Sequence, residues 1–159
     1  MTADAAKIDA IRFHFGPLLG KRITRYQTAE SLHEDGTWSI WPDLPIRIYT
    51  EESSLVSISW SCFDDLRLTA DESLPTWADD ETTRWVENGI ETINECLGRS
   101  IRGVLLGRGE MSISDREIEI WTRLIIDLGD RWLEVFNALD ENGYALHHEL
   151  PASEYTKCC

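Results

Sequence analysis

Hydrophobic residues alternate with polar ones in many short segments of this chain. In the clearest case, residues 56–62, Val56, Ile58, Trp60 and Cys62 are separated by single serines. Alternation of this kind puts every second side chain on one face of a sheet, as in a half-buried β-strand. Similar segments predict strands at residues 22–27, 37–41, 46–50, 55–62 and 66–69, and again at 101–106, 117–122, 124–127, 132–139 and 144–148.

Two segments instead repeat their apolar positions with the period of a helix. Residues 8–19 carry one such stripe and residues 82–97 another. Each stripe is followed by a glycine, Gly20 or Gly98, which is a common residue just beyond a helix C-terminus. We therefore predict one helix in each segment.

The two helical segments coincide when the chain is shifted so that Gly20 falls on Gly98. Leu19-Gly20-Lys21 then matches Leu97-Gly98-Arg99. The same register places Ile23 on Ile101, Ile40 on Ile118, Ile48 on Ile126, Leu55 on Leu133 and Leu68 on Leu146. We interpret this as an internal duplication. The alternative is that two unrelated segments share the same spacing of core residues.

The fold class that follows is α+β. We expect two tandem units, each a helix followed by antiparallel strands, with the helices packed on a mainly antiparallel sheet or pair of sheets. Residues 5–74 form unit one, residues 79–150 form unit two, and 74–81 is the connector between them. Residues 151–159 are expected to be a loose tail, and the whole chain of 159 residues a single compact domain.

The net charge of the chain indicates which classes of partner it can bind. The formal net charge is −14 at pH 7. A field of this sign disfavours nucleic acid and anionic membranes, and it attracts a basic protein. The plainer interpretation is that the acidity only keeps the protein in solution. No apolar run could span a membrane and no secretory signal is visible, so we expect a cytoplasmic protein.

An acidic interaction module is the function that we favour. Small acidic α+β proteins without catalytic motifs include inhibitors of basic proteins, among them immunity proteins that neutralise cationic toxins. Acidic loops would steer the partner, and a tryptophan would anchor it. The residues expected to bind the partner are Asp64, Asp65, Trp77, Asp79, Asp80 and Glu81.

The seven tryptophans support a second hypothesis, a small-molecule site or an enzyme with an aromatic cleft between the units. Trp38, Trp41 and Trp121 are the expected lining of that cleft; the alternative is that they fill the core. A third hypothesis is a homodimeric assembly protein. The sequence leaves open whether the protein is a monomer or a homodimer.

Catalytic and metal-binding motifs give little support to an enzyme. The adjacent pairs His147-His148 and Cys158-Cys159 are poor chelators, because neighbours on a strand point to opposite faces. Residues 140–143 are typical of a turn rather than a calcium loop. We therefore expect no cofactor and no metal site, and we favour a non-enzymatic protein while leaving catalysis open.

Overall fold

The computed structural model describes residues 4–74, 78, 81–110 and 112–159. Within them the protein is mostly antiparallel β-sheet with one α-helix, α1 (Ala5–Phe15). The α+β class is confirmed in this mainly β form. Among the described residues, no helix is long and apolar enough to cross a membrane.

Sheet one contains the strands of the first half of the chain and one strand from the start of the second half. Their order is β2-β1-β3-β4-β5, and β6 also pairs with β1. The strands are β1 (Ile23–Leu32), β2 (Trp38–Ile40), β3 (Ile46–Thr50), β4 (Leu55–Ser61), β5 (Asp65–Thr69) and β6 (Thr83–Glu87). The strands predicted in this half are confirmed, and β6 is additional.

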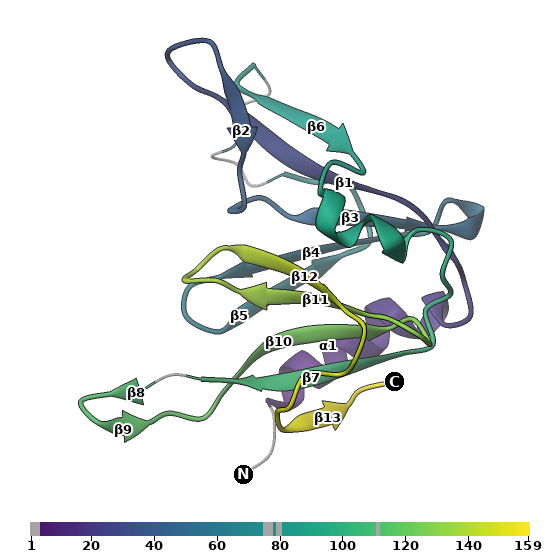
Figure 1. Ribbon diagram of the computed structural model, residues 1–159, viewed down its shortest axis with the longest axis vertical. Coiled ribbons are helices and arrows are strands. Elements are labelled where there is room, and N and C mark those ends of the chain that lie inside the picture. Colours follow the sequence, from purple (N-terminus) through teal and green to yellow (C-terminus); the bar gives the residue numbers. More distant parts are fainter. Residues whose placement is uncertain (1–3, 75–77, 79–80, 111) are drawn as a thin grey trace.

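Sheet two contains strands of the second half, in the order β12-β11-β10-β7-β13. They are β7 (Gly103–Gly109), β10 (Ile120–Asp127), β11 (Trp132–Asn137), β12 (Asn142–His147) and β13 (Tyr155–Lys157). A small hairpin of β8 (Ser112–Ile113) and β9 (Arg116–Glu117) projects from the β7–β10 connection (Figure 1). The 3-10 helices are η1 (Gly16–Leu18), η2 (Glu51–Ser53) and η3 (Glu91–Cys96).

One hydrophobic core joins the two sheets. The alternation in β4 puts Val56, Ile58 and Trp60 on the core face, and Leu133 and Val135 of β11 belong to the same cluster. Helix α1 adds side chains spaced four residues apart, including Ile11 and Phe15, both 0 % exposed. The core is thus shared by both halves of the chain, and α1 packs against β5 of sheet one and β7 of sheet two (Figure 1).

The start of β1 and the segment before β7 exchange backbone hydrogen bonds in a reciprocal pattern. Gly20 N donates to Ile101 O at 2.7 Å, and Gly98 N donates to Ile23 O at 2.8 Å. The shift that places Gly20 on Gly98 also places Ile23 on Ile101, so it converts each of these bonds into the other. Gly20 and Gly98 also share a φ of +82°, which an L-residue adopts only with strain.

The residue pairs within sheet one and within sheet two also match under this shift at first, but farther along the sheets the match is displaced by one residue. Tyr26 pairs with Ile48 in sheet one, as Val104 pairs with Ile126 in sheet two, and the same shift relates both strands. Ile48 then pairs with Val56, whereas Ile126 pairs with Leu133. The predicted match of Leu55 with Leu133 is therefore wrong by one residue, because the turn between β10 and β11 is one residue shorter than its counterpart.

The predicted second helix is wrong over most of its length. Residues 83–87 form strand β6, and only Glu91–Cys96 are helical, as the 3-10 helix η3. Thr83, Trp85 and Val86 are residues that favour a pleated strand. Trp85 pairs with Ala29 of β1, and the guanidinium of Arg47 lies 3.4 Å from its ring centroid. The cross-strand contacts thus override the helical period.

The expectation of a loose C-terminal tail is also wrong. Residues Tyr155–Lys157 form β13, which pairs antiparallel with β7, and Cys158 is 3 % exposed. The chain between β12 and β13 passes across sheet two from one edge to the other (Figure 1). Shortly after β5, Glu72 lies against sheet one, since Arg47 of β3 donates to Glu72 O at 2.6 Å.

Candidate interaction site

Two hairpin turns meet where sheet one approaches sheet two. We call residues 62–64, between β4 and β5, and residues 138–141, between β11 and β12, the paired turns. Asn137 Nδ2 donates to Phe63 O at 2.7 Å, and Phe63 N donates to Asp140 Oδ1. Because these hydrogen bonds run in both directions between the hairpins, the two turns form one surface.

The paired turns hold bulky residues in a conformation that costs free energy. Phe63 has φ +70° and Leu139 has φ +55°, in the left-handed region that suits glycine or asparagine. Both side chains are nevertheless directed to solvent: Phe63 is 46 % exposed and Leu139 is 93 % exposed. Strained backbone that presents exposed apolar side chains is characteristic of binding sites.

A cavity of about 430 Å³ opens beside these two side chains. Its lining comes from both turns and from the outer face of sheet two: Phe63, Gly109, Glu110, Ile120, Thr122, Arg123, Glu134, Phe136, Asn137, Leu139 and Asp140. The cavity lies over Gly109, where an added Cβ would come within 2.1 Å of Thr122 Oγ1. Glycine there lets β7 and β10 approach closely at the cavity wall.

A buried ion cluster forms part of the cavity wall. Arg123 Nε lies 2.6 Å from Glu134 Oε2, and His147 Nε2 lies 2.7 Å from Glu134 Oε1. The Glu134 side chain is 5 % exposed. Burial alone would raise the pKa of Glu134, but the hydrogen bonds from Arg123 and His147 outweigh it and keep that pKa below its ordinary value. The carboxylate therefore neutralises Arg123.

Two further charged residues line the cavity, and both are acidic. They are Glu110 and Asp140, and within the described residues Glu110 forms no hydrogen bond or ion pair. Asp65 and Glu141 lie on the same two hairpins. The lining thus holds three carboxylates, Glu110 among them, against the one guanidinium of Arg123, on which Glu110 also acts; this excess of negative charge attracts a cation.

The structure distributes the predicted partner-binding residues unevenly. Asp64 and Asp65 do lie at the paired turns, but Asp64 is tied to Lys7, with Nζ and Oδ2 3.2 Å apart. Glu81 is exposed just before β6, in sheet one. Trp77, Asp79 and Asp80 lie outside the described residues.

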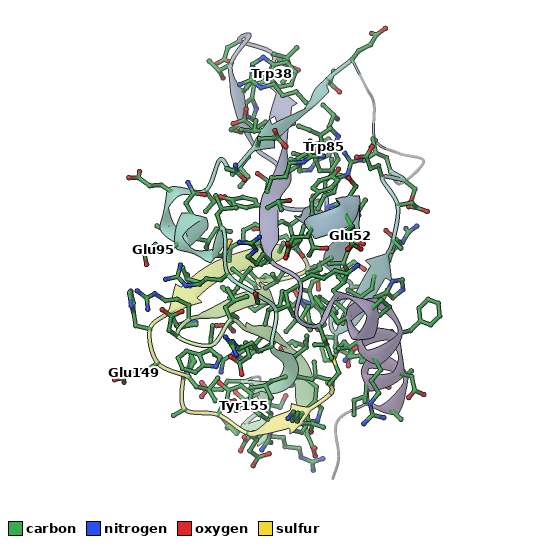
Figure 2. All side chains as sticks on the ribbon, turned by 90° about the vertical axis from the view of Figure 1, so that its right-hand side faces the viewer. Trp38, Glu52, Trp85, Glu95, Glu149 and Tyr155 are labelled. Carbon is green, nitrogen blue, oxygen red and sulfur yellow. The ribbon has the colours of Figure 1, made fainter. Side chains whose placement is uncertain are left out.

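The three tryptophans predicted to line a cleft have separate environments. Trp38 of β2 lies under the guanidinium of Arg84, 4.5 Å from the ring centroid, and Figure 2 shows it at one end of the molecule. Trp41 donates from Nε1 to Asp43 at 3.2 Å. Trp121 is 6 % exposed and belongs to the core. None of the three lines the cavity described above.

The histidines and cysteines do not converge. Among the described residues, no group of three or more His, Cys, Asp or Glu side chains is arranged to hold a metal ion. His147 is engaged with Glu134, and His148, the next residue, is exposed. Burial raises the pKa of the Cys96 thiol to about 12 and that of Cys158 to about 11, so both are protonated at neutral pH.

No protein-family model, curated protein or solved structure matches this chain. The candidate site therefore depends on its own geometry. Sequence reasoning missed Phe63, Leu139 and the cavity between them. A signal was present: each hairpin carries one large apolar residue beside an aspartate, in Phe63-Asp64 and Leu139-Asp140. The strand pattern could not show that the two turns touch.

Proposed function

We propose that this protein is a non-enzymatic acidic interaction module that binds a basic protein partner, as an inhibitor or immunity-type protein does. The paired turns are the proposed docking surface. The observation that carries the proposal is Leu139: a leucine that is 93 % exposed, in a strained backbone conformation, beside a cavity with acidic lining. A leucine placed in this way adds little to folding and is suited to contact a partner.

Charge and apolar contact have separate roles in such a complex. The net charge of −14 draws a basic partner inward at long range and raises the association rate. The apolar side chains of Phe63 and Leu139 then lose water on contact and slow dissociation. Asp65 and Glu141, which flank them on the two hairpins, supply the local acidic contacts.

The test compares two doubly charge-reversed variants of equal net charge. Asp65→Lys with Glu141→Lys changes the paired turns, and Glu34→Lys with Glu91→Lys changes exposed acids elsewhere. The side chains of Glu34 and Glu91 have no hydrogen bond or ion pair in the described residues, so their substitution leaves the fold intact. Each protein is used for capture from lysate of its source at low and moderate salt, and captured proteins are identified by mass spectrometry.

The proposal expects one basic protein to bind the wild type and the Glu34/Glu91 variant, and to be lost from the paired-turn variant. Added salt should weaken that binding. Equal capture by both variants would move the interaction away from the paired turns. Capture of only acidic or neutral proteins, or of none, would refute the basic-partner function.

A small-molecule site is the second candidate. The cavity volume of about 430 Å³ is within the range of ligand pockets. The proposed lining is now the cavity at the paired turns rather than Trp38, Trp41 and Trp121. A ligand would raise the thermal unfolding temperature of the wild type more than that of Leu139→Ala, which removes an exposed side chain from the cavity lining.

We also propose that the two sheets arose by internal duplication. The reciprocal hydrogen bonds of Gly20 and Gly98 support it, as does the equivalent order β1-β3-β4-β5 and β7-β10-β11-β12. Strands β6 and β13 each flank the first strand of their sheet, which favours a unit boundary after β6 rather than at residues 74–79.

A further inference from the structure

The cavity beside the paired turns has a lining suited to one particular kind of side chain. We infer that it receives a long basic side chain, arginine or lysine, from the partner. This inference depends on the proposed function and makes it more specific, because it assigns one contact chemistry to one cavity. It is supported by the volume of the cavity, its apolar walls and the placement of its charges.

The apolar walls fit the stem of such a side chain. Phe63 and Leu139 border the cavity from the turns, and Phe136 and Ile120 border it from sheet two. Arginine and lysine carry several methylene groups that bury against apolar surface while the charged head stays near water. The Phe63 and Phe136 rings could also contact the cation through their faces.

The charges fit the head group. Glu110 and Asp140 both line the cavity, and Glu110 has no hydrogen bond or ion pair in the described residues. Arg123, which also belongs to the lining, is held by the buried Glu134 in a two-bond pair, at 2.6 Å and 3.2 Å. Glu110 also acts on Arg123, but the three carboxylates of the lining outnumber this one guanidinium, so an incoming cation meets an excess of negative charge.

Two of these positions allow the charge to be removed with little structural change. Glu110→Gln removes a carboxylate to which no described residue donates a hydrogen bond. Asp140→Asn keeps a side-chain oxygen that can accept the hydrogen bond from Phe63 N, so the turn is retained. Glu91→Gln, at an exposed acid on η3, is the matched control.

The experiment uses blocked amino acids as probes for the full-length protein. N-acetyl-arginine methylamide, the lysine equivalent, the neutral isostere N-acetyl-citrulline methylamide and N-acetyl-norleucine methylamide are titrated into ¹⁵N-labelled protein. The readouts are the amide signals of Gly109 and Asn137, which line the cavity, and of Gly36, which lies in the β1–β2 connection.

The inference expects saturable shifts at Gly109 and Asn137 with arginine or lysine, and none at Gly36. Glu110→Gln and Asp140→Asn should each weaken that binding by about two- to fivefold, as loss of one exposed ion pair does, and Glu91→Gln should not. Citrulline or norleucine binding as well as arginine would overturn the inference, because the cavity would then not recognise charge. No saturable shift with either cation would overturn it too.

These outcomes are separate from those of the capture experiment. If blocked arginine and lysine fail to bind but the paired-turn variant still loses its basic partner, the proposed docking surface is supported and the proposed role of the cavity is refuted. If the cationic probes bind but no basic protein is captured, the cavity recognises cations and the protein-binding function falls.

Discussion

The side-chain amide of Asn142 forms two hydrogen bonds with the backbone of the strand that contains Trp60, as the backbone of a neighbouring strand would. Its Oδ1 accepts from Trp60 N at 2.8 Å, and its Nδ2 donates to Ile58 O at 2.9 Å. Asn142 is 3 % exposed and begins β12 in sheet two, whereas Trp60 belongs to β4 in sheet one. One side chain therefore satisfies two buried backbone groups across the junction of the sheets.

Replacing this amide should destabilise both halves of the protein together. Asn142→Ala leaves two buried backbone groups without partners, and we expect the free energy of unfolding to fall by about 3 kcal/mol. Urea unfolding followed by tryptophan fluorescence measures the change. Asn142→Asp retains the acceptor and loses the donor, so its cost should be at least as large, since a carboxylate would face Ile58 O. A loss below about 1 kcal/mol for Asn142→Ala would show that the bridge adds little stability.

The matching conformations of Gly20 and Gly98 give a quantitative test of pseudosymmetry. Both have φ +82°, and an added Cβ at either position meets no atom within 4 Å. Gly20→Ala and Gly98→Ala should therefore each lower the free energy of unfolding by about 1 kcal/mol, through backbone strain alone.

Gly16→Ala is the control for this comparison. Its Cβ also meets no atom within 4 Å, but its φ is −50°, which alanine adopts readily. This variant should leave stability unchanged or raise it by about 0.5 kcal/mol. Costs for Gly20→Ala and Gly98→Ala that differ by more than about 1 kcal/mol would argue against equivalent roles.

The buried ion cluster predicts a specific loss of stability in acid. The pKa of Glu134 is held below its ordinary value, so its contribution is present above the unfolded-state pKa and is lost as pH falls through the folded-state pKa. Glu134→Gln should lower the free energy of unfolding by about 3 kcal/mol at neutral pH, because Arg123 loses its buried partner.

The pH profile separates this effect from simple loss of packing. Between about pH 7 and pH 3, the wild type should lose more stability than Glu134→Gln, because the variant has no carboxylate to protonate. Glu91→Gln, at an exposed position, should follow the wild-type profile. Parallel profiles for wild type and Glu134→Gln would mean that the cluster does not contribute to the acid transition.

The sheets could be predicted from the sequence because their cause is local. Alternation in residues 55–62 identified β4, and residues 46–50 matched β3 at both ends. The period failed at residues 83–87, where Trp85 packs under Arg47 and pairs with Ala29 of a strand far away in the chain. Such a long-range contact decides whether the segment is a helix or a strand, and it cannot be predicted from the hydrophobic pattern of the segment itself.

The candidate site depends on contacts between segments far apart in the chain, so only fragments of it could be predicted. Asp64 and Asp65 were identified by charge, but the Lys7–Asp64 pair joins α1 to a hairpin 57 residues away. Phe63 and Leu139 become neighbours only because the two sheets share a core. Charge suggested the class of partner that we propose, whereas the proposed docking surface could be located only from the tertiary structure.

Leu139 offers a test in which stability and binding change in opposite directions. Its side chain is 93 % exposed and contributes little to the core, while its φ of +55° is strained for leucine. Asparagine tolerates this conformation, so Leu139→Asn should raise the free energy of unfolding by up to about 1 kcal/mol. The same change removes the apolar anchor, so capture of the basic partner should weaken.

Leu150→Asn, at a leucine that is 40 % exposed without positive φ, should give neither effect. A Leu139→Asn protein that is less stable than the wild type would show that the leucine is held for folding, and unchanged capture would show that it is not the anchor.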